Sequence, residues 1–166
     1  HKRVLEGDLG KNTGGMGAYS PSRLINNKLE KKIIDKIIEP TIRGLEEIGT
    51  KYKGFLYVGL MIVKGEPYLI EYNVRMGDPE CQTILPKLNS SLLDIFLACC
   101  EGKLDKCTIK WQDKKSLCIV LCSKGYPDTF KKNLPIKNIE KIKLSTNEYI
   151  YHAGTTRVDK EVLSCG

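Results

Sequence analysis

Apolar side chains recur at every third or fourth position between residues 29 and 48, which is the spacing of one face of an α-helix. Asn26 or Asn27 is suited to cap the start of this helix, and Gly49 to end it. Pro40 is predicted to kink or break it, because proline lacks the backbone N–H that a helix interior needs. We expect the apolar face to be core packing; it comprises Leu29, Ile33, Ile34, Ile37, Ile38, Ile42, Leu45 and Ile48.

The next pattern is that of a β-hairpin. Residues 55–63 are rich in aromatic and branched side chains, which indicates a buried strand. Residues 64–67, Lys-Gly-Glu-Pro, predict a turn into a second strand that ends at Asn73. The two strands are therefore expected to be antiparallel.

The remaining chain predicts one helix and several short strands. Residues 91–101 form an apolar helical pattern that we expect to be mostly buried, with Gly102 as its end. Strands are predicted at residues 117–121, 139–144 and 149–151, and an apolar pair near the C-terminus begins another.

These elements predict an α+β fold, that is, a mixed α/β arrangement with an antiparallel sheet and helices. We place a boundary within residues 82–89, so that residues 1–85 form a catalytic portion and residues 86–166 a small mixed α/β domain. The chain begins at His1 without an initiator methionine and ends just after a strand has begun. We therefore expect a piece of a longer protein, with an incomplete second domain.

Candidate chemistry lies at the end of the second hairpin strand. Side chains alternate across a strand, so Glu71 and Asn73 are predicted to share one face. A carboxylate and an amide oxygen suit a hard divalent cation such as Mg²⁺. Arg75 follows, and its guanidinium can hold an anion through two donors. Taken alone, the pair is more often the polar face of a half-exposed strand.

A glycine-rich segment covers residues 7–21. Its glycines allow positive φ angles and a close approach of backbone N–H groups to a ligand. Asp8, Asn12 and Thr13 add short polar side chains. The spacing matches neither the dinucleotide-binding nor the P-loop pattern. As a bare glycine cluster, it is as compatible with a surface loop as with a binding site.

The amino-acid composition excludes some classes of function and indicates a cellular compartment. The formal charge of +7 comes from lysines scattered among glutamates, without interleaved aromatic residues, so nucleic-acid binding is not indicated. Part of the positive charge would favour anionic substrates. Seven cysteines without a Cys-x-x-Cys pair and two histidines do not suggest structural zinc. Reduced, buried cysteines and the lack of a membrane-length apolar run predict a cytoplasmic protein.

Together, the two motif segments resemble a known family. Asp-x-x-x-Asn-Thr-Gly-Gly-Met-Gly-Ala-Tyr-Ser-Pro begins at Asp8, Gly-Phe-Leu-Tyr-Val-Gly-Leu-Met covers 54–61, and Glu-Tyr-Asn-Val-Arg-Met-Gly-Asp-Pro-Glu covers 71–80. The chain resembles the phosphoribosylamine–glycine ligases of the ATP-grasp superfamily, and the similarity extends over nearly its whole length. It departs from the family pattern at Lys11, where proline is usual, and at Tyr72, Val74 and Met76.

The resemblance implies a reaction and a role for each motif. Glycine is joined to 5-phosphoribosylamine through an acyl phosphate, while ATP becomes ADP and phosphate. Glu71 and Asn73 would hold Mg²⁺ or Mn²⁺ at the phosphates, and Arg75 would neutralise the transferred group. A further acidic ligand on the preceding strand is usual in the family, where this chain has Gly59 and Met61. The residues implied in catalysis are Arg75 and Asp8, and those implied in substrate binding are Asp8, Asn12, Thr13, Gly14, Gly15, Met16, Gly17, Arg75 and Asp78. Asp78 and Glu80 would orient Arg75 or brace its loop, and a purely structural role for these two is equally compatible with the sequence.

The resemblance also implies that parts of the enzyme are missing. ATP-grasp enzymes hold the nucleotide against a lid domain, which would precede His1. The 166-residue chain is therefore expected to be inactive alone and to require the N-terminal and lid domains of its own polypeptide. Its partners are expected to be small-molecule substrates, without nucleic acid or membrane. Two alternatives remain open: another ATP-grasp carboxylate–amine ligase, or a non-catalytic nucleotide-binding remnant.

Overall fold

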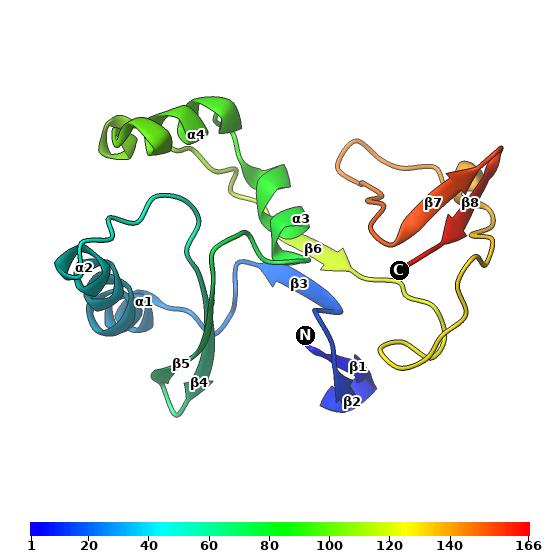
Figure 1. Cartoon of the computed structure of the whole chain (residues 1–166), viewed down its shortest axis with the longest axis horizontal. Coiled ribbons are helices and arrows are strands. Elements are labelled where there is room, and N and C mark those ends of the chain that lie inside the picture. Colours follow the sequence, from blue (N-terminus) through cyan, green and yellow to red (C-terminus); the bar gives the residue numbers. More distant parts are fainter. The chain divides into compact units, whose positions relative to one another are not determined.

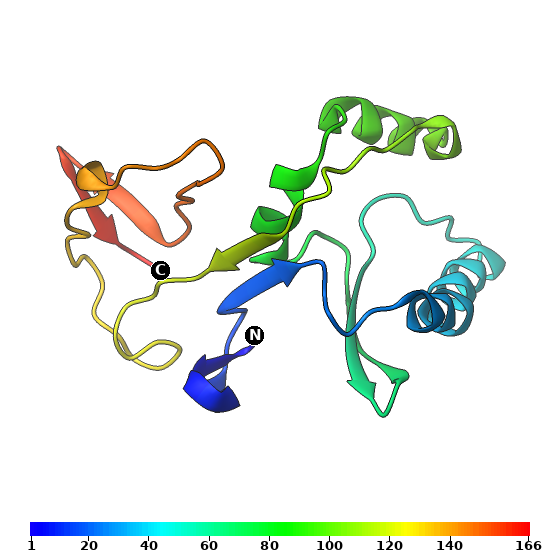
Figure 2. The same cartoon turned by 180° about the vertical axis from the view of Figure 1, so that it is seen from behind.

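The computed structural model describes residues 1–166 (Figures 1 and 2). Contacts within the chain divide it into two compact units. Unit 1 combines His1–Met16 with Ile119–Gly166, and unit 2 is Gly17–Cys118. A backbone hydrogen bond from Val120 N to Met16 O, 3.0 Å long, joins the two segments of unit 1. The predicted boundary after residue 85 lies inside unit 2. It remains a prediction about the domains of a longer protein.

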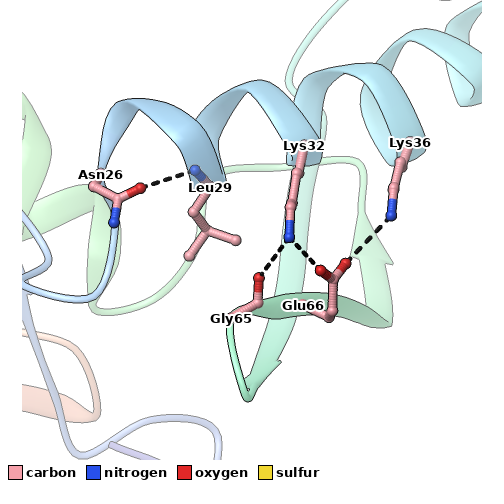
Figure 3. Close-up of polar contacts among 6 residues, drawn as sticks. All are labelled: Asn26, Leu29, Lys32, Lys36, Gly65 and Glu66. Atoms are coloured by element: carbon pink, nitrogen blue, oxygen red, sulfur yellow. Dashed lines mark hydrogen bonds and ion pairs between the residues drawn. The ribbon is translucent and has the colours of Figure 1, made fainter.

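A helical rod follows the first strand of unit 2, and its middle is wound more widely than an α-helix. It runs from α1 (Asn27–Ile33) through a π-helical stretch (Ile34–Ile38) into α2 (Glu39–Glu47). The side chain of Asn26 accepts from the Leu29 amide at 2.9 Å, which confirms the predicted cap (Figure 3). The amide of Glu39 donates to Ile34 O, five residues back. The rod widens just before Pro40, whose missing N–H and bulky ring disfavour the regular α-helical ladder there.

The apolar face of this rod is only partly core. Leu29 and Ile33 are buried, at 5% and 8% exposure, but Ile42 is 47% and Ile48 is 74% exposed. The expectation that the whole face is core packing was therefore wrong. The helical periodicity was right, but a periodic stripe does not specify how much partner surface lies against it.

The hairpin follows as predicted. Strand β4 (Tyr57–Val63) pairs antiparallel with β5 (Glu66–Asn73). Lys64 and Gly65 form the turn with φ angles of 51° and 78°, the left-handed values that suit a two-residue hairpin loop. A bulge between Gly59 and Leu60 shifts the register. The first strand was expected to be buried, but Met61 and Val63 are exposed, which corrects that prediction.

Ion pairs fasten this hairpin to the helical rod. Lys32 Nζ donates to Gly65 O at 3.2 Å and to the Glu66 carboxylate, and Lys36 Nζ reaches Glu66 Oε2 at 3.2 Å (Figure 3). These two lysines lie four residues apart, on one side of the helix. They lower the pKa of Glu66 below its ordinary value, mainly through the hydrogen bonds they donate.

The rest of unit 2 contains short elements. They are β3 (Gly17–Ser20), α3 (Glu80–Ile84), a 3-10 turn (Leu85–Lys87), α4 (Leu92–Glu101), a 3-10 turn (Leu104–Lys106) and β6 (Ser116–Ile119), whose last residue falls in unit 1. Strands β3 and β6 pair in a two-stranded sheet. Ser91 caps α4 through the Asp94 amide, and Gly102 ends it in the left-handed conformation, as predicted. The predicted burial of α4 was wrong, because Leu93 is 65% exposed.

Unit 1 consists of hairpins and loops. Its elements are β1 (Arg3–Leu5), a 3-10 turn (Glu6–Asp8), β2 (Leu9–Asn12), a 3-10 turn (Ile139–Lys141), β7 (Thr155–Val158) and β8 (Glu161–Ser164). β8 confirms the strand predicted near the C-terminus. The strands predicted at 139–144 and 149–151 do not form: residues 139–141 are a 3-10 turn, and residues 149–151 have no regular secondary structure.

The cysteines differ from expectation in one respect. All seven are unpaired thiols, but they are half-buried or exposed rather than buried. Burial raises the pKa of the Cys118 thiol, and the negative charge of Asp78 adds to this effect. No helix is both long and apolar enough to cross a membrane.

Candidate functional site

The end of β5 carries the predicted metal-binding pair. Asn73 lies opposite Tyr57, and Glu71 lies opposite Gly59 in the hairpin register. Both predicted ligands are half-buried. Tyr72 lies between them in sequence and is hydrogen-bonded through its hydroxyl to Thr41 of the helical rod. Alternation along the strand therefore separates Tyr72 from the carboxylate and the amide.

Gly59 leaves room for the Glu71 side chain. A β-carbon at residue 59 would lie 2.9 Å from Glu71 Cγ and 3.4 Å from Glu71 O. An acidic side chain at this position of β4 would thus displace Glu71 itself. Met61, the other candidate position on β4, is 55% exposed. At the end away from its turn, the hairpin therefore offers one carboxylate, from Glu71, and one amide, from Asn73.

An open pocket of about 450 Å³ lies beside the strand end, and it is lined by Arg75, Met76, Gly77, Asp78, Cys81 and Gln82. Arg75 is exposed, and its guanidinium donates to Met76 O at 2.8 Å. Asp78 Oδ1 accepts from Gln82 Nε2 at 2.8 Å, while Gln82 Oε1 is buried without a hydrogen-bond partner. Asp78 was predicted to orient Arg75 or to brace its loop, and its carboxylate is hydrogen-bonded to Gln82. The pocket lining combines a guanidinium with carboxylate and amide oxygens.

Tyr57 and Glu80 are packed against the backbone of the arginine loop, which we define as Arg75–Gly77. The Tyr57 hydroxyl donates to Glu80 Oε1 at 3.3 Å. Burial raises the pKa of Tyr57, with further contributions from the charges of Glu80 and Glu71; Arg75 opposes the shift. The phenol therefore lies within the electrostatic reach of all three charged groups. The sequence reasoning missed Tyr57, because its residue type suits a buried strand and carries no motif.

The glycine-rich segment belongs to unit 1 up to Met16, and its backbone is largely engaged within the chain. The Thr13 N–H and hydroxyl both donate to Lys2 O at 2.7 Å. Gly15 N donates to Thr13 Oγ1 at 3.2 Å, and Met16 N to His1 O at 2.7 Å. Three of the backbone groups proposed to donate to substrate thus have partners in this conformation.

Asp8 and Lys11 lie on the exposed side of this segment. Asp8 has a φ angle of 59° and lies 3.9 Å from the Arg3 guanidinium. Lys11, where the family pattern has proline, forms an ion pair with Asp128. Asn12 ends β2 and is exposed. The lysine therefore ties the segment to the later part of unit 1.

The predicted site residues fall in both units. Glu71, Asn73, Arg75 and Asp78 belong to unit 2, where Arg75 and Asp78 line one pocket. Asp8 and residues 12–16 belong to unit 1, and Gly17 begins β3 of unit 2. Their roles in binding and catalysis remain predictions. His152, expected to be structural, has its Nδ1 3.1 Å from Thr155 Oγ1 within unit 1.

A carboxylate and an amide at the end of a hairpin strand, followed by an arginine and a tight turn, are the arrangement expected of the ATP-grasp class of ligases. Residues 1–81 match the family "Phosphoribosylglycinamide synthetase, ATP-grasp (A) domain". This part of the chain belongs to that ATP-grasp family, and the fold is the expected mixed α/β one. Over its whole length, the chain is related to phosphoribosylamine–glycine ligases.

Relatives with this name come from distant organisms. The ligase of Brucella melitensis is 43% identical over 166 residues, covering 100% of this chain and 39% of the relative. That of Vigna unguiculata is 47% identical over 158 residues, covering 93% and 51%. A crystal structure of the Thermotoga maritima ligase is 34% identical with a TM-score of 0.81, covering 99% of this chain and 40% of that one. The chain thus spans about two fifths to one half of the length of these relatives.

Proposed function

We propose that this chain is the part of an ATP-dependent carbon–nitrogen ligase that carries its metal-binding strand. The whole enzyme would join glycine to 5-phosphoribosylamine, giving glycinamide ribonucleotide, ADP and phosphate in purine biosynthesis. The observation that carries the proposal is the position of Glu71 and Asn73 at the end of β5, followed by Arg75 on the wall of a pocket, within a chain related throughout to ligases of that name.

The donor set fits Mg²⁺ or Mn²⁺ shared with a nucleotide. The chain contains no group of three or more histidine, cysteine or acidic side chains able to enclose a metal. Mg²⁺ typically uses one or two carboxylates and takes its other ligands from water and substrate phosphates. Glu71 and Asn73 are the residues that would hold the ion. When bound, it would neutralise phosphate charge during transfer.

The protein groups supply positioning and charge. Two anions, the glycine carboxylate and the γ-phosphate, must meet to form the acyl phosphate, so the barrier is largely electrostatic. Arg75, on the pocket wall, would offset the charge of the transferred phosphoryl group through its forked donors. Asp78 and the segment from Asn12 to Gly17 would bind the substrates, and Asp8 would accept a hydrogen bond from the ribosylamine.

We further propose that activity requires domains beyond these 166 residues, including the lid that covers ATP, and that the enzyme is cytoplasmic. A different ATP-grasp carboxylate–amine ligase is the second candidate, because the strand-end motif is shared across the superfamily. The glycine-rich segment at residues 12–17 favours the glycine ligase over this alternative.

The test is ADP release by a full-length ligase carrying this chain, supplied with Mg²⁺, ATP, glycine and freshly generated phosphoribosylamine. Release should require both glycine and the amine, and Glu71→Ala should lower the rate by about a hundredfold or more. Tyr68→Phe on the exposed side of the same hairpin is the matched control and should keep full activity. Release with another acid–amine pair would overturn the substrate assignment.

A further inference from the structure

Tyr57 lies where the metal-binding strand pair meets the arginine loop. It is the first residue of β4, and it lies opposite Asn73 in the hairpin register. Its hydroxyl donates to Glu80 Oε1 at 3.3 Å. One side chain thus connects the hairpin with the residue that begins α3.

The loop backbone is closely packed against this pair. A β-carbon on Gly77 would lie 2.7 Å from Tyr57 Cε2 and would collide with the Glu80 carboxylate. Gly77 O accepts from Cys81 N at 2.9 Å, which ties the loop to α3. Gly77 is buried, whereas Arg75, two residues earlier, is exposed beside the pocket. The backbone that carries the guanidinium is therefore supported by Tyr57 and Glu80.

We propose that Tyr57, through its hydrogen bond to Glu80, is a positioning residue that sets the arginine loop relative to Glu71 and Asn73. This inference rests on the proposed ligase function and adds a residue to it. Tyr57 acts on the loop that holds Arg75 and needs no contact with substrate. Removing its hydroxyl leaves the metal ligands in place but releases one support of the loop.

The test compares Tyr57→Phe with the wild type in the full-length ligase, with Tyr68→Phe as the control. Tyr68 is 56% exposed on the same hairpin, so loss of its hydroxyl should change nothing. In Tyr57→Phe, kcat for ADP release should fall by about tenfold or more, since small misplacements of a catalytic group are costly. The KM for ATP and the thermal midpoint should stay close to the wild-type values.

Glu80→Gln and the double variant complete a cycle. If the two residues act through one hydrogen bond, the double variant should be no slower than the slower single variant. A Tyr57→Phe enzyme with wild-type kcat overturns the inference. A lower kcat accompanied by a clearly lower thermal midpoint also overturns it, because a general loss of stability would then explain the lower rate. An inactive wild type would overturn the proposed function together with this inference. An active wild type and an equally active Tyr57→Phe variant would overturn this inference alone, so the two failures are distinguishable.

Discussion

Gly59→Ala tests whether the space opposite Glu71 is required for metal binding. The β-carbon added at residue 59 would lie 2.9 Å from Glu71 Cγ. Carbon atoms in good contact are separated by about 3.5–4.0 Å, so Glu71 would have to shift by roughly 0.6–1.1 Å. Cγ is near the base of the side chain, and the carboxylate must therefore move with it.

That shift is large compared with the tolerance of a metal site. Ligand distances in such sites are held to about 0.2 Å. We therefore expect the affinity for Mn²⁺ to fall by about ten- to a hundredfold, the loss typical when the support of a ligand is removed. The fold should persist, since a moderate rotamer strain of about 0.5–1.5 kcal/mol is sufficient to accommodate the methyl group.

The assay is titration of the full-length ligase with Mn²⁺ in the presence of a non-hydrolysable ATP analogue, with free Mn²⁺ measured by electron paramagnetic resonance. Gly44→Ala is the control, because a β-carbon there has no atom of another residue within 4 Å apart from the backbone of its own helix. If Gly59→Ala binds Mn²⁺ as tightly as the wild type while Glu71→Ala does not, the steric reasoning is refuted. If neither variant changes the affinity, the metal site itself is wrongly assigned.

Three further substitutions test the helical rod and its attachment to the hairpin. Asn26→Ala removes the N-cap and should lower the free energy of unfolding by about 1 kcal/mol in denaturant titrations, whereas Asn26→Ser should retain most of it. Gly44→Ala, inside α2, should raise that free energy by about 0.5–1 kcal/mol; a lower value would show that the helix needs its flexibility there. Glu66→Gln removes a carboxylate whose pKa is lowered by Lys32 and Lys36, so its stabilisation is present above the ordinary value of 4.5 and is lost as the pH falls through the lowered pKa. Melting temperatures of wild type and Glu66→Gln should therefore differ at neutral pH and converge in acid; a difference that does not depend on pH would refute the ion-pair explanation.

Features that depend on a few adjacent residues were predictable from the sequence. The N-cap at Asn26, the turn at Lys64 and Gly65, and the left-handed end at Gly102 were all predictable, because each depends on the backbone preferences of one to four adjacent residues. The alternation that separates Glu71 from Tyr72 follows equally from strand geometry. Such features are local, and residue type largely determines them.

Burial and pairing depend on residues far apart in the chain. The apolar stripe of the helical rod has the right period, yet Ile48 is exposed while Leu29 is buried, since burial depends on what packs against each turn. The apolar runs at 139–144 and 149–151 do not become strands, because a strand needs a partner to satisfy its backbone groups. Neither fact is contained in the segment itself.

In the candidate site, too, some features depend on adjacent residues and others on contacts between distant segments. The carboxylate and amide at residues 71 and 73 were recognisable from their spacing, because a strand places alternate side chains on one face, and the guanidinium at residue 75 follows the strand end. The support from Tyr57 and Glu80, 23 residues apart, and the engagement of the Thr13 amide by Lys2 depend on tertiary packing. Sequence alone determined which chemical groups are present and how neighbours along one strand are spaced. Only the folded chain decided which of these groups are held by others, since such contacts follow from packing between distant segments.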